Sequence, residues 1–495
     1  MCCCRELRRP LFLSVTSGGL LFQSAAYLSV FLVCVAVLAK AASPTLRQAV
    51  LVVASYGLYL TWTRWFAAVL IVSVVVNYLL GKWLRRNPTA ARLWVGICLN
   101  VLLLGAFKYV PEISVQIAIA SLKSFSHIAL PLGISFWTFQ ALSYLFDIYR
   151  EEELDPSFAE FALYMAFFPV TIAGPVCRMP EMLPQFRSQR TTPWSEIGEG
   201  FRRIAVGAFM MQLAKLLGLG ILAGDSIVTG FDRTTHWSGP DVWLLAFGYG
   251  LQLFFDFAGY SHIAIGAART LGIGVPENFD RPFASTTPSI FWTRWHMSLS
   301  YWICDYVFLP LATMRREIWW RHLTLILAMT LFGLWHKASL LFLLWGCYHG
   351  ILLVLHRQVQ QTQRKLNREP PAGPWKLVSW IATMTLINAG WIFFRANSLA
   401  QARQMLSALL SPRSYAEHFL SSSLYLLVGL LAAGYAAVLL ISSKLQPQRE
   451  ATRQSLLVRG RWFWIPPLYA LAMILLLLIT LTQSGGVGQL MYRGF

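Results

Sequence analysis

Charged residues are scarce in this sequence. Of its 495 residues, 13% are charged and 56% are hydrophobic, whereas a soluble domain carries about 25% charged residues. Acidic residues are the rarer kind, because 22 Asp and Glu oppose 41 Lys and Arg and leave a formal net charge of +19. The basic residues gather in short loops between apolar runs, which is the positive-inside pattern of membrane proteins. The charge therefore predicts a lipid bilayer as a partner and argues against nucleic acid.

Several catalytic and metal-binding signatures are also missing. The sequence has no G-x-S-x-G nucleophile elbow, no G-x-x-x-x-G-K-[ST] phosphate loop and no H-E-x-x-H motif. None of its eight cysteines forms a C-x-x-C pair, so we expect neither a metal site nor a disulfide framework. Cys2, Cys3 and Cys4 lie between the N-terminus and a basic cluster before an apolar run, where acylation is a weaker alternative to simple burial.

Apolar runs recur along the whole chain. A membrane-spanning helix needs about 20 apolar residues, so we expect an all-α polytopic membrane protein with about eleven spans and some re-entrant or interfacial helices. The candidate runs are 11–39, 49–62, 65–81, 93–107, 128–148, 158–176, 201–223, 242–266, 299–313, 323–354, 377–394, 424–443 and 464–482.

The basic loops predict the orientation of the chain. The loops 355–376 and 444–462 are strongly basic and are separated by two candidate spans, so they fall on the same side of the membrane. Both are expected to be cytoplasmic, as is the loop that runs from Lys82 to Arg92. The loop 395–423 and the C-terminal tail are then expected to face outward.

The run 323–354 is too long for one straight span. As a helix its 32 residues would extend about 48 Å, whereas the hydrocarbon core is about 30 Å thick. We therefore expect it to tilt, break or fold back, with Gly333, Gly346 and Gly350 as candidate break points. Irregular backbone at this depth is tolerated only inside protein or beside a watery cavity, so His336 is expected to face a cavity.

A different kind of segment precedes this run. Residues 270–288 are rich in turn formers and charge, and they predict a loop at the membrane surface. From Ile290 onward we expect an interfacial helix, because tryptophan and tyrosine favour the membrane boundary. Arg294 and Asp305 are expected to face its polar side or a funnel. The aromatic residues concerned are Trp292, Trp295, Trp302 and Tyr306.

Two histidines, His296 and His336, are the strongest candidates for chemistry. Each follows a tryptophan directly in apolar surroundings, and an ionisable group at membrane depth is costly and therefore a functional candidate. Without a protein nucleophile, a lone histidine acts as a general base toward a substrate hydroxyl. That oxygen then attacks an activated acyl carbon, as in a thioester. A structural histidine that hydrogen-bonds between helices is an equally good interpretation at this point.

Other polar residues in apolar runs are weaker candidates. We expect His349 to pack a helix end and His262 to hydrogen-bond within the helix bundle. Asp147 and Asp256 also lie in or near apolar runs. A buried carboxylate needs a partner, which the sequence does not identify.

Several longer motifs resemble those of the membrane-bound O-acyltransferase (MBOAT) family, in the branch of the alginate O-acetyltransferases and the teichoic acid D-alanyl transfer proteins. The segment 291–300, FWTRWHMSLS, is similar to F-W-R-R-W-H-I-S-L-S, and the segment 333–338, GLWHKA, is similar to G-L-W-H-G-A. The resemblance covers nearly the whole chain in one order. The other matching segments are 54–59, 76–81, 168–178, 182–186, 255–266, 276–279 and 390–396.

The resemblance implies a fold and a site. It implies a ring of membrane helices around a thin central funnel, forming one domain over 1–495. Within that domain we expect N-terminal helices in 1–125, a catalytic core in 126–356 and C-terminal helices in 377–495. His336 falls on the family's catalytic histidine and His296 on the second histidine of the funnel. The remaining expected funnel residues are Arg294, Trp295, Asp305, Trp335 and Lys337.

The resemblance also implies a reaction. An O-acetyltransferase would take an acetyl group from a cytoplasmic thioester donor, acetyl-CoA or another acyl thioester, with no bound cofactor. It would pass the group across the bacterial inner membrane toward an exported polysaccharide such as alginate, or another exopolysaccharide or peptidoglycan. A periplasmic acetyltransferase is the expected protein partner.

Three departures from the family pattern leave alternatives open. Lys337 replaces a glycine, His262 an aspartate and Thr293 an arginine. Lys337 is expected either to repel a proton from His336 or to reach away from it. A transporter or channel with buried proton-relay histidines is the main alternative function. A scaffold that has lost activity is a weaker one.

Overall fold

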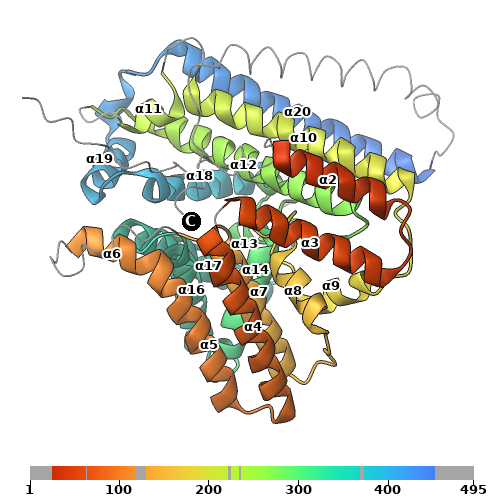
Figure 1. The fold of residues 1–495 in the computed structure, drawn as a ribbon. Helices are drawn as coiled ribbons and strands as arrows, with labels where there is room; N and C mark the ends of the chain where they lie inside the picture. The colour runs from red at the N-terminus through yellow and green to blue at the C-terminus, as the bar shows by residue number, and fades with distance from the viewer. Residues whose placement is uncertain are drawn as a thin grey trace, which may run out of the picture.

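The expected all-α class is confirmed. A computed structural model describes residues 25–62, 64–117, 130–220, 225–232, 236–367 and 373–451. Within these ranges the ordered elements are helices, and the one extended pairing is an isolated antiparallel bridge between Phe279 and Trp295. Figure 1 shows long helices packed at steep angles to one another, with α4 and α5 descending from the body to form a tip.

The helices that build this body are, in chain order, α2 (Ala25–Leu38), α3 (Pro44–Trp62), α4 (Arg64–Arg86), α5 (Ala90–Leu104), α6 (Val110–Ile117), α7 (Ile134–Tyr149), α8 (Phe158–Ala166), α9 (Met179–Phe186), α10 (Trp194–Leu219), α11 (Ile227–Asp232), α12 (Gly239–Thr270), α13 (Pro288–Trp292), α14 (Met297–Ile303), α15 (Leu309–Ala312), α16 (Ile318–His336), α17 (Leu340–Lys365), α18 (Pro374–Arg395), α19 (Leu399–Leu410) and α20 (Ser422–Ala451). Two π-helical turns, Gly105–Tyr109 and Cys304–Phe308, interrupt the helical path between α5 and α6 and between α14 and α15.

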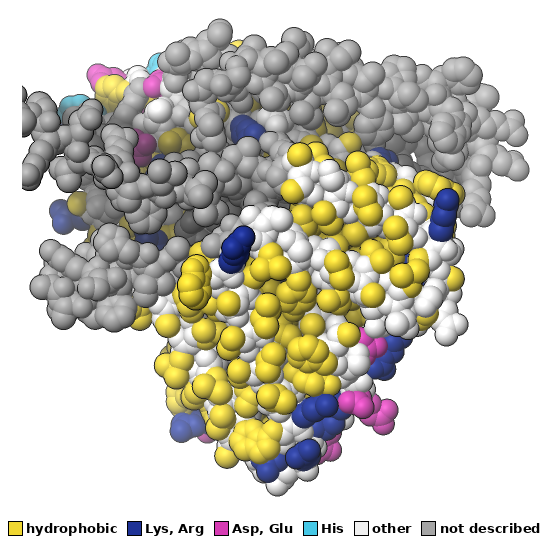
Figure 2. All heavy atoms as spheres, in the orientation of Figure 1, with side chains coloured by type: hydrophobic (Ala, Val, Ile, Leu, Met, Phe, Trp, Pro, Cys, Tyr) yellow, Lys and Arg dark blue, Asp and Glu magenta, His cyan; other side chains and the backbone are white. Residues whose placement is uncertain are grey.

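The outward surface suits a lipid environment. Seven helical segments of the described residues are long and apolar enough to cross a membrane: Arg64–Arg86, Ala90–Ser114, Gly239–Thr270, Ile318–His336, Leu340–Lys365, Pro374–Arg395 and Ser422–Ile441. Val53 and Leu102 are 73% and 68% exposed, which is costly in water and favourable against acyl chains. Figure 2 shows hydrophobic side chains over the face formed by α3, α4 and α5, with charged ones at the tip.

Two expected spans were wrong. The run 158–176 holds only the nine-residue helix α8 before the chain turns at Phe167, and Pro169 follows, which cannot continue a helix. The run 299–313 is divided among α14, a π-helical turn and α15. The run 158–176 is largely buried in the protein, so its apolar composition reflects a core, whereas most residues of 299–313 are only partly buried. The runs 464–482 and 11–24 lie outside the described residues.

The long run 323–354 does break, but not at a glycine. Helix α16 ends at His336, and α17 begins at Leu340. Gly333, Gly346 and Gly350 instead lie where the two helices cross. A Cβ added at Gly333 would lie 2.2 Å from the Phe342 carbonyl oxygen, and one at Gly346 would lie 2.4 Å from that of Met329. The glycines therefore allow direct backbone contact, as small residues do between membrane helices.

A second glycine contact fixes the central column of the fold. Helix α12 is the most buried of the candidate spans, with 89% of its apolar window inside the protein. It packs along α10. A Cβ added at Gly207 would lie 2.4 Å from the Gly259 carbonyl oxygen, and one added at Gly200 would lie 2.6 Å from that of Gly266. Because both helices lack side chains at these points, α12 lies close enough to α10 to be enclosed on that side.

The α16–α17 crossing predicts a specific packing defect. Gly346→Val inserts two methyl groups and a Cβ where the Met329 carbonyl leaves 2.4 Å. We expect it to destabilise the protein by at least the roughly 1–3 kcal/mol typical of overpacking, seen as a lower Tm of the protein in detergent. The matched control is Gly434→Ala on α20, where a Cβ meets nothing within 4 Å. An equal Tm for Gly346→Val and wild type would show that the helices are not in backbone contact.

An ion pair between the first turn of α8 and the residue after α9 predicts a pH dependence of stability. Arg187 donates two hydrogen bonds to the Glu160 carboxylate, at 2.7 and 2.9 Å, and this pairing holds the pKa of Glu160 below its ordinary value. A carboxylate whose folded pKa is depressed stabilises the protein above its unfolded pKa, about 4.3, and this stabilisation is lost as pH falls through the folded value. We therefore expect Glu160→Gln to lower Tm at pH 7 and to approach wild type below about pH 4. A Tm difference that stays constant over this range would contradict the assignment.

Candidate functional site

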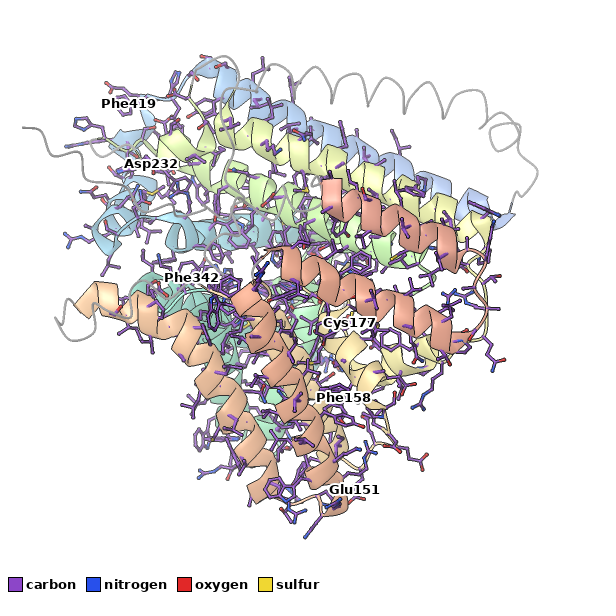
Figure 3. The ribbon with its side chains drawn as sticks, in the orientation of Figure 1. Glu151, Phe158, Cys177, Asp232, Phe342 and Phe419 are labelled. Carbon is purple, nitrogen blue, oxygen red and sulfur yellow. The ribbon has the colours of Figure 1, made fainter. Side chains whose placement is uncertain are left out.

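His336 lies at the end of α16, enclosed by aromatic rings. Only 3% of the residue is exposed. Its ring centroid lies 4.6 Å from that of Trp335, 4.9 Å from Phe332, 5.2 Å from Phe394 and 5.7 Å from Trp345. Phe342, in the first turn of α17, marks this region at mid-height of the molecule in Figure 3, far from Glu151 at the tip. The imidazole is thus buried where the helix hairpin reverses.

His296 reaches the same region from a strained backbone. It is the residue before α14, with φ +45° in the left-handed region, which is uncommon for a residue other than glycine and often marks a functional site. The residue is 1% exposed, and its ring packs edge-on against Phe257 at 4.5 Å. The imidazoles of His296 and His336 are near enough to interact electrostatically. The structure therefore brings the two predicted histidines together from separate short elements.

A chain of buried hydrogen bonds holds His296 in place. Asn278 donates to the Ser261 hydroxyl at 3.0 Å, and its side-chain oxygen accepts from the Ser298 hydroxyl at 2.6 Å. Ser298 also accepts from the Val176 backbone N–H at 2.9 Å, and the Asn278 carbonyl accepts from the Met297 N–H at 2.9 Å. Four motifs distant in sequence thus meet immediately after His296. Buried polar networks of this kind fix one geometry when every member is satisfied.

The aromatic residues around His296 form a core, which corrects the expected interfacial helix. Trp292, Trp295, Trp302 and Tyr306 are all buried. Trp295 stacks on Phe291 and lies 5.2 Å from Trp391 of α18. Indole rings favour a membrane boundary only when water is accessible to them, and here neighbouring helices cover them.

Arg294 and Trp335 occupy different parts of this region. Arg294 is half-buried, and its carbonyl accepts from the Asp280 N–H at 3.1 Å beside the Phe279–Trp295 bridge. It therefore closes the 270–288 loop onto the histidine segment. The Trp335 ring lies against His336 and against Phe139 of α7, at 5.3 Å, and forms one wall of the site.

Lys337 turns away from His336. Its Nζ lies 3.8 Å from a carboxylate oxygen of Glu112, and its side chain is about half exposed. The other Glu112 oxygen accepts from the Ala338 N–H at 3.2 Å. Glu112 thus fixes the break between α16 and α17 and draws the lysine outward. Of the two expectations for Lys337, the structure supports the one in which it reaches away.

Asp305 belongs to a separate polar cluster nearer the tip. Its carboxylate accepts from Arg178 at 2.6 Å, and its backbone carbonyl accepts from Arg150 at 2.6 Å. Both guanidinium groups lie 5.1 Å from the centroid of the Tyr306 ring. Tyr306 in turn donates to Asp147 at 2.7 Å, which identifies the partner of that buried carboxylate. Arg150 adjoins Glu151 at the tip in Figure 3, so this cluster lies between the tip and the histidines.

Lys108 is the residue that the sequence reasoning missed. It lies in the π-helical turn after α5 and is 7% exposed, with its Nζ 4.7 Å from the centroid of the Trp335 ring. The predicted span 93–107 ended just before it, and a lysine in that position usually reaches the membrane boundary. A usable signal was a single charge within the apolar segment Gly105–Val110.

The other weak candidates have structural partners. His262 accepts a hydrogen bond from the Arg203 Nε at 3.1 Å, and Arg203 also pairs with Glu277. His349 is fully buried and packs against Gly390 of α18, where an added Cβ would lie 2.4 Å from its Nε2. Thr293 is exposed and its hydroxyl donates to the Ile290 carbonyl at 2.9 Å. The three departures from the family pattern, at Lys337, His262 and Thr293, thus concern the surroundings of the site.

Comparison with known proteins decides the family. The sequence profile of the MBOAT, membrane-bound O-acyltransferase family, matches residues 91–399. The chain belongs to the membrane-bound O-acyltransferase family. The resemblance in the motifs is therefore confirmed, and this acyltransferase is a multi-pass membrane enzyme.

Its relatives include enzymes whose names give different acceptors. A peptidoglycan O-acetyltransferase of Helicobacter pylori is 32% identical over 404 residues, 75% of each chain. A probable alginate O-acetylase AlgI of Pseudomonas aeruginosa is 34% identical over 409 residues, 79% of this chain and 75% of the relative. A teichoic acid D-alanyltransferase of Bacillus subtilis is 28% identical over 278 residues, 53% of this chain and 68% of the relative.

The network behind His296 predicts a loss of both stability and activity in this acyltransferase. Asn278→Ala leaves the Ser261 and Ser298 hydroxyls buried without their shared partner, which costs about 1–3 kcal/mol. We expect a lower Tm, and less acyl transfer per folded molecule because His296 is no longer held. The control is Asn87→Ala, whose side chain is exposed. Wild-type Tm and activity for Asn278→Ala would show that the network does not hold the site.

Proposed function

We propose that this acyltransferase is an O-acetyltransferase that moves an acetyl group from a cytoplasmic thioester to an exported polysaccharide, with His336 as the general base. The observation that carries the proposal is the enclosure of His336 among aromatic rings at a helix break, with His296 beside it. Such a site excludes water, so a reactive acyl group is protected from hydrolysis.

The chemistry requires no nucleophile from the protein. His336 takes the proton of the acceptor hydroxyl as its oxygen bonds to the thioester carbonyl carbon. The tetrahedral adduct then collapses, the carbon–sulfur bond breaks, and the proton passes from His336 to the departing thiolate. His296 is proposed to orient the acceptor or the donor carbonyl. No cofactor is needed beyond the donor, acetyl-CoA or another acyl thioester.

The arrangement suggests a route for each substrate. The basic loop near Arg85 and the Arg150 cluster both lie toward the tip, and positive charge in short loops is typical of the cytoplasmic side. The donor would then approach from the tip, past Tyr306, Trp302 and the Trp335 wall. The acceptor would approach from the opposite side. In a bacterial inner membrane that side is the periplasm, where a partner acetyltransferase would complete transfer to the polymer.

The proposed base predicts a large loss of transfer. We expect His336→Ala to lower the rate of ester-linked acetyl appearing on the exported polymer by about 100-fold or more, because general-base catalysis contributes about 10²–10⁴-fold. The measurement is acetate released by mild alkali from the exported polymer of cells that carry each variant as their only copy. Protein level in the membrane is quantified in parallel.

The matched control is His322→Ala, a histidine at the start of the same helix, α16, at the end opposite His336. It should retain wild-type acetylation. Wild-type acetylation by His336→Ala at an equal membrane level would overturn the proposed mechanism. An equal loss of acetylation in both variants would indicate damage to α16 and not to the reaction.

A further inference from the structure

Lys108 has an environment that is costly for a structural lysine. The residue is buried, and among the described residues no acceptor lies within hydrogen-bonding distance of its Nζ. An ammonium group at membrane depth is expensive and marks a functional site by default. The surrounding backbone is a π-helical turn, a feature that occurs frequently at functional sites. Position, burial and backbone therefore each point to a role for this side chain.

The nearest carboxylate is shared with other groups. Glu112 lies one helical turn beyond Lys108 and attracts it electrostatically, but one Glu112 oxygen accepts from the Ala338 N–H and the other lies 3.8 Å from the Lys337 Nζ. Lys108 instead rests on the face of Trp335, whose ring also contacts His336. One indole thus touches both the ammonium and the proposed base, and the ammonium is within electrostatic range of the His336 ring. The Lys108 Nζ thus makes no hydrogen bond to a described residue and lies over an aromatic face.

We propose that Lys108 stabilises the oxyanion that forms on the acyl carbonyl during transfer. This inference rests on the proposed function of His336. When the acceptor oxygen bonds to the thioester carbon, the carbonyl π bond breaks and its electron pair becomes a negative charge on oxygen. The Lys108 ammonium, held over the Trp335 face, stabilises that negative charge without giving up its proton. When the carbon–sulfur bond breaks, the carbonyl re-forms and the charge leaves the oxygen.

The energetic argument favours this role over permanent ion pairing. A cation that shares its nearest counter-ion, Glu112, with Lys337 interacts weakly with the neutral thioester and strongly with the charged adduct, so its effect is greatest in the transition state. The surrounding rings lower the local dielectric constant and strengthen that interaction. Because the ammonium is already in place, little reorganisation is needed when the charge develops.

The test compares four variants in the acetylation assay and in purified protein. The variants are Lys108→Met, which removes the charge, Lys108→Arg, which keeps it, His336→Ala and Lys82→Met. Lys82 is a matched control, because its Nζ also lies 4.7 Å from an aromatic centroid, that of Tyr78, on helix α4. Each purified variant is also given acetyl-CoA with water as the acceptor, and the release of CoA thiol is measured.

We expect Lys108→Met to lower kcat by about 10²–10³-fold, as the loss of one oxyanion donor does, with Lys108→Arg recovering at least tenfold of the loss. Lys82→Met should match wild type. The loss should appear equally in polymer acetylation and in acetyl-CoA hydrolysis, because both reactions pass through the same oxyanion. Membrane level and Tm of each variant separate this effect from misfolding.

The outcomes distinguish the inference from the function on which it rests. If His336→Ala retains wild-type acetylation, the proposed function fails and the role of Lys108 with it. If His336→Ala is inactive but Lys108→Met matches Lys82→Met, only the role of Lys108 is overturned. If Lys108→Met impairs polymer acetylation and leaves hydrolysis of acetyl-CoA at the wild-type rate, the lysine serves the acceptor, and the oxyanion role is again overturned.

Discussion

Backbone contact between α16 and α17 determines where the site can be. Gly333, Gly346 and Gly350 let the two helices approach until the carbonyls of one reach the glycines of the other. Between membrane helices such packing replaces the hydrophobic effect, since lipid tails are as apolar as the side chains. The hairpin therefore reverses within three residues, and the last residue before the reversal is His336. A looser crossing would move the break between α16 and α17, and His336 with it, toward solvent or lipid.

The polar groups of the interior then sort into two kinds. Asn278, Ser261 and Ser298 satisfy one another and join segments far apart in sequence, so they contribute a fixed geometry. The groups around His336 contact mainly aromatic faces. In a region of low dielectric constant, polar groups held this way retain their capacity to interact strongly with a substrate. The first kind fixes the geometry around His296, and the second surrounds His336, the proposed base.

Comparison of prediction and structure shows where sequence reasoning succeeded. Length alone showed that the run 323–354 must tilt, break or fold back, because about 48 Å of helix exceeds the bilayer core. It did not show that the glycines hold the hairpin together and that Glu112 fixes the break. The tryptophans after Ile290 were assigned to a membrane surface but are buried. Lys108 was overlooked because a lysine at the end of an apolar run is ordinarily a boundary residue.

The sequence by itself determined the membrane environment, the helical class and the family, and it singled out the two histidines as site candidates. These follow from composition, from the length of apolar runs and from motifs contiguous in the chain, all of which are local properties. Only the tertiary structure decided that Lys337 turns toward Glu112, that Asp305 lies in a separate cluster and that Lys108 faces Trp335. Each of these depends on a partner distant in sequence. A side chain's direction is set by what packs against it, and periodicity along one helix does not contain that information.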